Sequence, residues 1–159
     1  MMESLVDKVM QSIIQVNELY HRLILLVAPA GAGKTPALQE IGRRTGAPLI
    51  NINLELSRRM LDLTERQRAL YLPRLFSEIV NMSHTDLILL DNMEVLFELS
   101  LQQDPLRLLQ GLSRNRTVVA AWNGSIENQH LTYATPDHPE YRRYPLRDLT
   151  IITPEVHHE

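Results

Sequence analysis

The sequence predicts an α/β fold, a three-layer sandwich in which helices cover both faces of a five-stranded, mainly parallel sheet. Apolar runs typical of buried strands alternate along the chain with segments of helical composition. This alternation is the pattern of a parallel sheet with crossover helices. A length of 159 residues, with 44% hydrophobic and 22% charged residues, fits one globular domain spanning 1–159 and leaves little room for a second.

The composition argues against several classes of protein. A net charge of −3 does not suggest an obligate nucleic-acid binder, and the absence of cysteine removes disulfides, thiol catalysis and thiolate metal sites. No apolar run approaches the roughly 18 residues that a membrane helix needs, and the amino terminus lacks the order of a signal peptide. We therefore expect a cytoplasmic protein without a membrane partner.

The N-terminal segment 3–21 predicts an amphipathic helix, because its apolar residues recur three or four positions apart. Such a stripe packs on the domain or binds a partner, and packing is the favoured interpretation. The next segment, 23–27, is the first buried strand.

A glycine-rich loop joins this first strand to a helix, which is the arrangement of a Walker A motif or P-loop. A helix that begins abruptly after a strand leaves N–H groups free at its positive end, where phosphate binds. Lys34 would reach the β- and γ-phosphates of ATP, and the Thr35 hydroxyl would hold Mg²⁺. The predicted nucleotide-binding residues are Pro29, Ala30, Gly31, Ala32, Gly33, Lys34, Thr35 and Pro36.

Residues 48–53 read as a second strand, in which Asn51 and Asn53 either line the site or end the strand with polar groups. The stretch 54–82 is helical by composition. Thr64 begins a capping-box pattern within it, and Pro73 should kink the helix or start a new one.

The apolar run 87–90 ends in Asp91, which is a Walker B pattern. A strand buried on both faces is continuously hydrophobic, and the acid at its carboxyl end would emerge beside the P-loop to bind Mg²⁺ together with Thr35. Many ATPases carry glutamate directly after this aspartate as the general base, but here the residue is Asn92, which cannot accept a proton. Glu94 is the nearest carboxylate, and it is either that base or an ordinary acid in the first turn of a helix.

A helix is predicted to begin at Pro105, followed by a fourth strand over 117–124. Asn123 near its end is either a sensor of the γ-phosphate or part of an Asn-Gly turn. The segment 124–147 is predicted to be an irregular insert, with 131–133 as a candidate short strand, before the last strand at 148–152. It carries Arg142 and Arg143, which are candidates for an arginine finger acting across a subunit interface, although surface solvation is the simpler interpretation.

The order of the P-loop strand, second strand, Walker B strand, asparagine-tipped strand and last strand resembles the core of AAA+ and RecA-like ATPases. In that class the asparagine-tipped strand lies between the P-loop and Walker B strands, so the resemblance implies this order here. The chain stops after its fifth predicted strand, and the small helical lid of full AAA+ proteins is therefore expected to be absent. The predicted catalytic residues are Lys34, Asp91, Glu94, Asn123, Arg142 and Arg143, and the predicted metal ligands are Thr35 and Asp91.

Segments 28–35, 89–92, 104–111 and 118–124 resemble the BrxF family, the small P-loop ATPases of type 3 BREX bacteriophage-defence systems. The resemblance implies a cytoplasmic bacterial ATPase that works with other BREX proteins, with DNA as a further partner reached directly or through them. Nothing in the composition itself indicates phage defence.

Three functional hypotheses remain open from the sequence. The first is an ATPase or nucleotide switch that uses ATP and Mg²⁺ within a homo-oligomer, and Asn92 predicts that its turnover is slow in isolation. The second is a small P-loop kinase. The third is a non-hydrolysing, nucleotide-bound scaffold or DNA-binding module.

Overall fold

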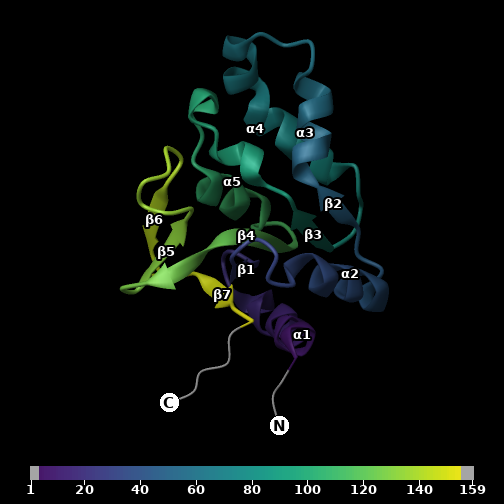
Figure 1. The fold of residues 1–159 in the computed structure, drawn as a ribbon. Helices are drawn as coiled ribbons and strands as arrows, with labels where there is room; N and C mark the ends of the chain where they lie inside the picture. The colour runs from purple at the N-terminus through teal and green to yellow at the C-terminus, as the bar shows by residue number, and fades with distance from the viewer. Residues whose placement is uncertain (1–3, 155–159) are drawn as a thin grey trace.

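The computed structural model describes residues 4–154, which fold as the predicted three-layer α/β sandwich (Figure 1). Five parallel strands form the middle layer in the order β2-β3-β4-β1-β7. The predicted fold class is confirmed, and β4 lies between β1 and β3, as the order of the motifs implied. The strands are β1 (Leu23–Ala28), β2 (Leu49–Asn51), β3 (Leu87–Asp91), β4 (Thr117–Glu127) and β7 (Thr150–Ile152).

Strand β1 is central because neighbours cover it on both edges and helices cover it on both faces. All six of its residues are buried, and it pairs with β4 from Leu23 opposite Val118 to Ala28 opposite Asn123. This register brings Asn123 to the same carboxyl edge of the sheet at which the glycine-rich loop begins.

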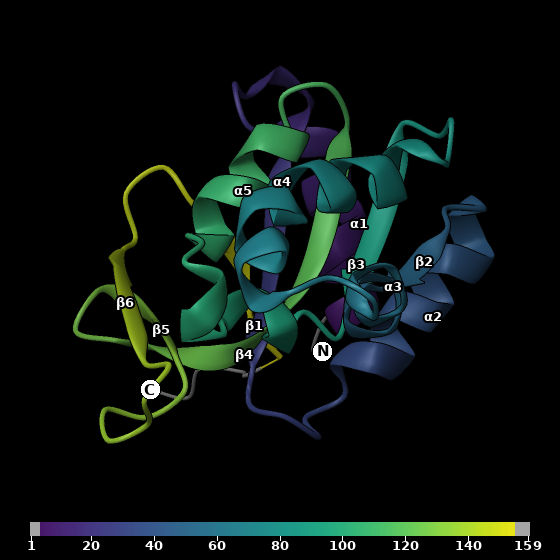
Figure 2. The same ribbon diagram turned by 90° about the horizontal axis from the view of Figure 1, so that it is seen from above.

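The helices divide between the two faces of the sheet (Figures 1 and 2). Helices α1 (Leu5–Gln15) and α2 (Lys34–Thr45) cover one face, where Val9, Leu38 and Ile41 pack with alternate residues of the central strands. The other face packs against α3 (Ile52–Met60), α4 (Glu65–Asn81) and α5 (Pro105–Leu112) through a larger apolar core. No described helix is long and apolar enough to cross a membrane.

The N-terminal helix is shorter than the predicted 3–21. It begins after Ser4, whose hydroxyl accepts the N–H of Asp7, and gives way after Gln15 to a single 3₁₀ turn at Val16–Glu18. Position 3 lies outside the described residues. Val9 and Val16 are buried, so this segment packs on the domain, as the favoured interpretation held.

The second strand and the following helical segment also differ from prediction. The strand ends at Asn51 rather than at 53, because the Asn51 side chain accepts the N–H of Leu54 and caps α3. The predicted helix 54–82 is two helices, and Thr64 forms the expected capping box at the start of the second, α4. Helix α4 continues through Pro73, so the break falls before Thr64 and not at the proline.

The segment 124–147, predicted to be irregular apart from a candidate strand at 131–133, is largely an antiparallel β-structure that includes this strand. Strand β4 runs past Asn123 to Glu127, pairs with β5 (His130–Tyr133), and β5 pairs with β6 (Arg142–Pro145). The β4–β5 turn has positive φ at Asn128 and Gln129, which is the twist that tight hairpins favour. Phe97 stacks on Tyr133 and anchors β5 to the core. The last strand begins at Thr150, two residues later than predicted.

Candidate active site

A cleft of about 290 Å³ lies at the carboxyl edge of the parallel sheet, where β1 and β3 end and β4 passes Asn123. It brings together most of the residues that the sequence singled out in separate motifs. Its lining consists of Ala30, Gly31, Gly33, Lys34, Thr35, Pro36, Asp91, Asn92, Glu94 and Asn123.

The loop between β1 and α2 has the backbone shape that its glycines predict. Gly31 and Gly33 have φ of 81° and 94°, values that side-chain-bearing residues rarely adopt. A Cβ at either glycine would meet nothing within 4 Å, so the backbone conformation and not the available space requires glycine. Gly33 precedes α2, and Pro36 lies in its first turn, where no N–H is needed. The amino end of α2 therefore opens into the cleft.

Lys34 is 5% exposed and lies at the closed end of this loop. Its ammonium donates to the carbonyl oxygens of Ala28 and Pro29 at 2.7 and 2.8 Å. Burial lowers the pKa of Lys34 below its ordinary value, while the carboxylates of Asp91 and Glu94 act in the opposite direction. These carboxylates and the two carbonyls help to keep a positive charge in the cleft.

Thr35 and Asp91 are joined across the cleft, although they are 56 residues apart in the chain. The Thr35 hydroxyl donates to Asp91 Oδ2 at 2.6 Å, and Asp91 Oδ1 accepts the backbone N–H of Asn92 at 2.9 Å. A carboxylate beside a hydroxyl is an oxygen donor set that suits Mg²⁺. The residues present therefore fit the metal that the two motifs predicted.

Glu94 lies between two side-chain amides from different elements. Asn53 Nδ2 donates to Glu94 Oε1 at 2.8 Å, and Asn123 Nδ2 donates to Glu94 Oε2. The acid is therefore held in a fixed orientation at the edge of the cleft, next to the end of β4. This contact places Asn123 in the site and removes the Asn-Gly turn interpretation, since β4 continues beyond it as a strand.

Asn92 turns the chain between Asp91 and Glu94. Its φ of 52° turns the chain at the end of β3, so that a 3₁₀ helix begins at Glu94. Asn53 fixes this turn on both sides: its N–H donates to Asn92 O at 2.7 Å and its Oδ1 accepts the N–H of Val95 at 2.8 Å. Asparagine tolerates this left-handed conformation better than most residues.

Asn53 is the site residue that the sequence reasoning left undecided. The prediction kept it as either a lining residue or a polar strand end, and the structure places it at the start of α3 in contact with Glu94. The available signal was a pair of asparagines at alternate positions, Asn51 and Asn53, after the apolar residues at 48–50.

Arg142 and Arg143 lie apart from the other predicted catalytic residues. They belong to β6, opposite Tyr133 and Thr132 of β5, and not to an irregular loop. Neither lines the cleft. The described chain therefore does not bring them to its own P-loop, and a role across a subunit interface remains a prediction.

Comparison with known proteins gives limited support. No protein family and no curated protein sequence matches the chain. Among solved structures, the chain is similar to that of C. elegans PCH-2, with a TM-score of 0.40 and 14% identity over 94% of this chain. It covers only 40% of the length of PCH-2.

Proposed function

We propose that the chain, as one domain over 1–159, binds Mg-ATP in this cleft and hydrolyses it to ADP and phosphate. One observation carries the proposal: the 2.6 Å contact between Thr35 and Asp91 unites the hydroxyl at the end of the P-loop with the acid at the end of β3. Two motifs that each occur by chance elsewhere meet here at the end of a parallel sheet, where α/β proteins bind ligands.

The chain supplies the groups that phosphate binding needs. Free N–H groups at the start of α2 would bind the phosphates, and the Lys34 ammonium would neutralise their charge. Mg²⁺ held by Thr35 and Asp91 would neutralise charge that develops on the γ-phosphate during transfer.

Glu94 is the proposed general base. In hydrolysis, a water oxygen bonds to the γ-phosphorus, the bond to the β–γ bridging oxygen breaks, and the water proton passes to the Glu94 carboxylate. Asn53 and Asn123 hold that carboxylate from both sides. While both amides bind it, its oxygens are less available to water, which supports slow turnover by the isolated chain.

The test begins with the P-loop lysine. The sequence contains one other lysine, Lys8, which lies on α1 and provides a matched control. Lys34→Ala should abolish ATP binding, measured by calorimetry, and phosphate release, while Lys8→Ala should keep both. Normal ATP affinity in a folded Lys34→Ala protein would remove the basis of the proposal. Nucleotide that binds wild type without being hydrolysed would favour the scaffold hypothesis, and phosphate transferred to an acceptor would favour a kinase.

We further propose a homo-oligomer in which Arg142 or Arg143 of one copy serves the cleft of the next. An arginine supplied in this way contributes on the order of 10³-fold or more to the rate. Equal amounts of Lys34→Ala and of Arg142→Ala/Arg143→Ala, each inactive alone, should regain part of the activity when mixed. A mixture that stays inactive contradicts this arrangement.

The resemblance to BrxF supports a place for this activity in a cytoplasmic BREX assembly with other BREX proteins and with DNA. Purification of the tagged chain from a host that carries such a system, followed by mass spectrometry, tests this assignment. Recovery of the chain without any other BREX protein would count against it.

A further inference from the structure

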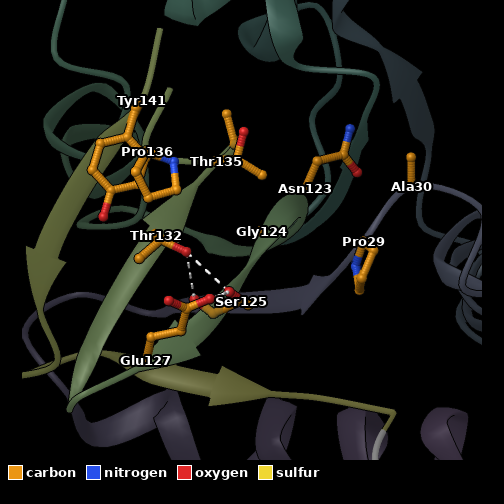
Figure 3. A pocket seen from close by; sticks show the side chains of 11 residues that line it. Pro29, Ala30, Asn123, Gly124, Ser125, Glu127, Thr132, Thr135, Pro136 and Tyr141 are labelled. Carbon is orange, nitrogen blue, oxygen red and sulfur yellow. Dashed lines mark hydrogen bonds between the residues drawn. The ribbon is translucent and has the colours of Figure 1, made fainter. Parts of the chain in front are cut away.

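A second pocket, of about 270 Å³, adjoins the P-loop on the side of the β4–β5 hairpin (Figure 3). It shares Ala30 and Asn123 with the nucleotide cleft. The two spaces therefore meet at Ala30, in the P-loop, and at Asn123 of β4. The volume is near the lower limit for ligand pockets, so its ligand is small.

One wall of this pocket is a polar face of β4. Residues two apart on a strand point to the same side, which groups Asn123, Ser125 and Glu127. Glu127 is the only charged residue among the described residues that line the pocket. The Ser125 hydroxyl donates to Glu127 Oε2 at 2.9 Å. It also lies 3.0 Å from the Thr132 hydroxyl, and dashed lines in Figure 3 join Thr132 to Ser125. The carboxylate is thus oriented by its neighbours.

No ion pair among residues 4–154 involves Glu127. Glu127 is also exposed, so a ligand can reach its carboxylate. The remaining walls include Pro29, Pro136 and Tyr141, which offer apolar surface. A ligand with a cationic end and an alkyl body matches this combination.

The pocket is built on a fixed backbone. A Cβ at Gly124 would lie 1.8 Å from the carbonyl oxygen of Thr132, so only glycine allows β4 and β5 to approach this closely. The same carbonyl accepts the indole N–H of Trp122 at 3.0 Å. The backbone of β4 therefore determines the distance between Asn123 and Glu127, the two ends of the polar face.

That distance defines the length of the ligand. From Asn123 to Glu127 the strand advances four residues, roughly 13 Å at about 3.3 Å per residue. If ATP occupies the neighbouring cleft, its phosphates would add negative charge at the Asn123 end, while the Glu127 carboxylate supplies it at the other end. Two anionic groups at the ends of a partly apolar pocket suit a linear dication.

We propose that this pocket binds a linear organic dication of the alkyl diamine class, with one cationic end on Glu127 and the other beside the γ-phosphate. The coupling to nucleotide rests on the proposed function, whereas the contact with Glu127 does not. Because coupling between two binding sites is reciprocal, the dication tightens ATP binding and ATP tightens dication binding.

The experiment measures binding of putrescine by calorimetry to the full chain, with and without a non-hydrolysable ATP analogue. Butylamine, which has the same four carbons and one charge, is the ligand control. Glu127→Gln is the protein control, and it also corrects for complexes that diamines form with free nucleotide. Glu140→Gln, on the same insert but outside the pocket lining, controls for loss of one surface charge.

We expect wild type and Glu140→Gln to bind putrescine about tenfold more tightly than Glu127→Gln does and about tenfold more tightly than they bind butylamine. Equal affinities in these comparisons, or no binding to wild type, overturn the pocket assignment. If wild type fails to bind the ATP analogue, the proposed function is wrong. The pocket assignment is then still tested by comparing putrescine binding to wild type and to Glu127→Gln without nucleotide. If both ligands bind without affecting each other, the coupling is wrong.

Two basic side chains on another protein segment carry the same chemistry as a free diamine. A lysyl-lysine amide peptide is therefore titrated in parallel. Tighter Glu127-dependent binding of the peptide assigns the pocket to a basic segment, and tighter binding of putrescine assigns it to a free diamine.

Discussion

Glu94→Gln is the most informative change in the proposed active site, because it removes a base and keeps its shape. A positioned general base contributes about 10²–10⁴-fold to a rate. The substitution should therefore lower kcat for ATP hydrolysis by that factor. At about 1.4 kcal/mol per factor of ten, this is about 3–5 kcal/mol in the barrier.

The hydrogen bonds around Glu94 indicate that the variant stays folded. Asn53 cannot rotate its amide, because its Oδ1 already accepts the N–H of Val95. The introduced amide can present its oxygen to Asn53 and its NH₂ group to Asn123, provided that Asn123 rotates to offer its oxygen. Two charge-assisted hydrogen bonds become neutral ones, a loss of about 1–2 kcal/mol that is offset in part because no charge is buried.

The assay pairs phosphate release with ATP affinity, which should stay close to that of wild type. Glu98→Gln, four positions later and exposed, is the matched control and should keep normal turnover. Hydrolysis at the wild-type rate in Glu94→Gln would show that another group accepts the proton, and the assignment of the base would be wrong.

Two further predictions concern the end of β3 and the tyrosines Tyr133 and Tyr144. Asp91→Ala should abolish hydrolysis and remove the magnesium dependence of ATP binding, whereas Asn92→Ala should keep measurable phosphate release; equal inactivity would show that Asn92 positions water or metal. Burial raises the pKa of Tyr133 to about 12, so the unfolded chain ionises first and stability should fall as pH rises from about 10 to 12. Tyr133→Phe should make the decrease in the free energy of unfolding between pH 9 and pH 11.5 smaller by about 2 kcal/mol. Urea unfolding at the two pH values measures this decrease, and the same decrease in wild type and variant would contradict the prediction. Burial also raises the pKa of Tyr144, which accounts for a further part of the loss.

The sequence predicts the part of the site that depends on local patterns. The turn at Gly31 and Gly33 follows from the conformations that glycine allows, and Asp91 follows from the end of a continuous apolar run. Both signals are confined to a few adjacent residues. The parallel arrangement of the strands then determines that the two motifs meet at one edge of the sheet.

The parts that the sequence does not predict depend on contacts between distant segments. Nothing near Asn53 indicates that it meets Glu94, since the contact depends on how α3 packs beside the turn at Asn92. The β4–β5–β6 structure is difficult to predict because its prolines and the polar residues Ser125 and Glu127 weaken the apolar pattern of a strand. Such polar alternation is typical of a hairpin that lies outside the main core. Arg142 is therefore placed on a strand that the sequence treats as a loop.

The length of β4 has a mechanical consequence. Its first half pairs with β1 and β3, and its second half pairs with β5 in the hairpin. The strand is continuous between the two halves. Asn123 sits at the junction, so a pull or twist on the hairpin travels along a continuous backbone to the amide that touches Glu94. A continuous strand of this kind transmits a displacement without a hinge or a moving lid. A partner that binds the hairpin and displaces it is therefore expected to shift Asn123 relative to Glu94.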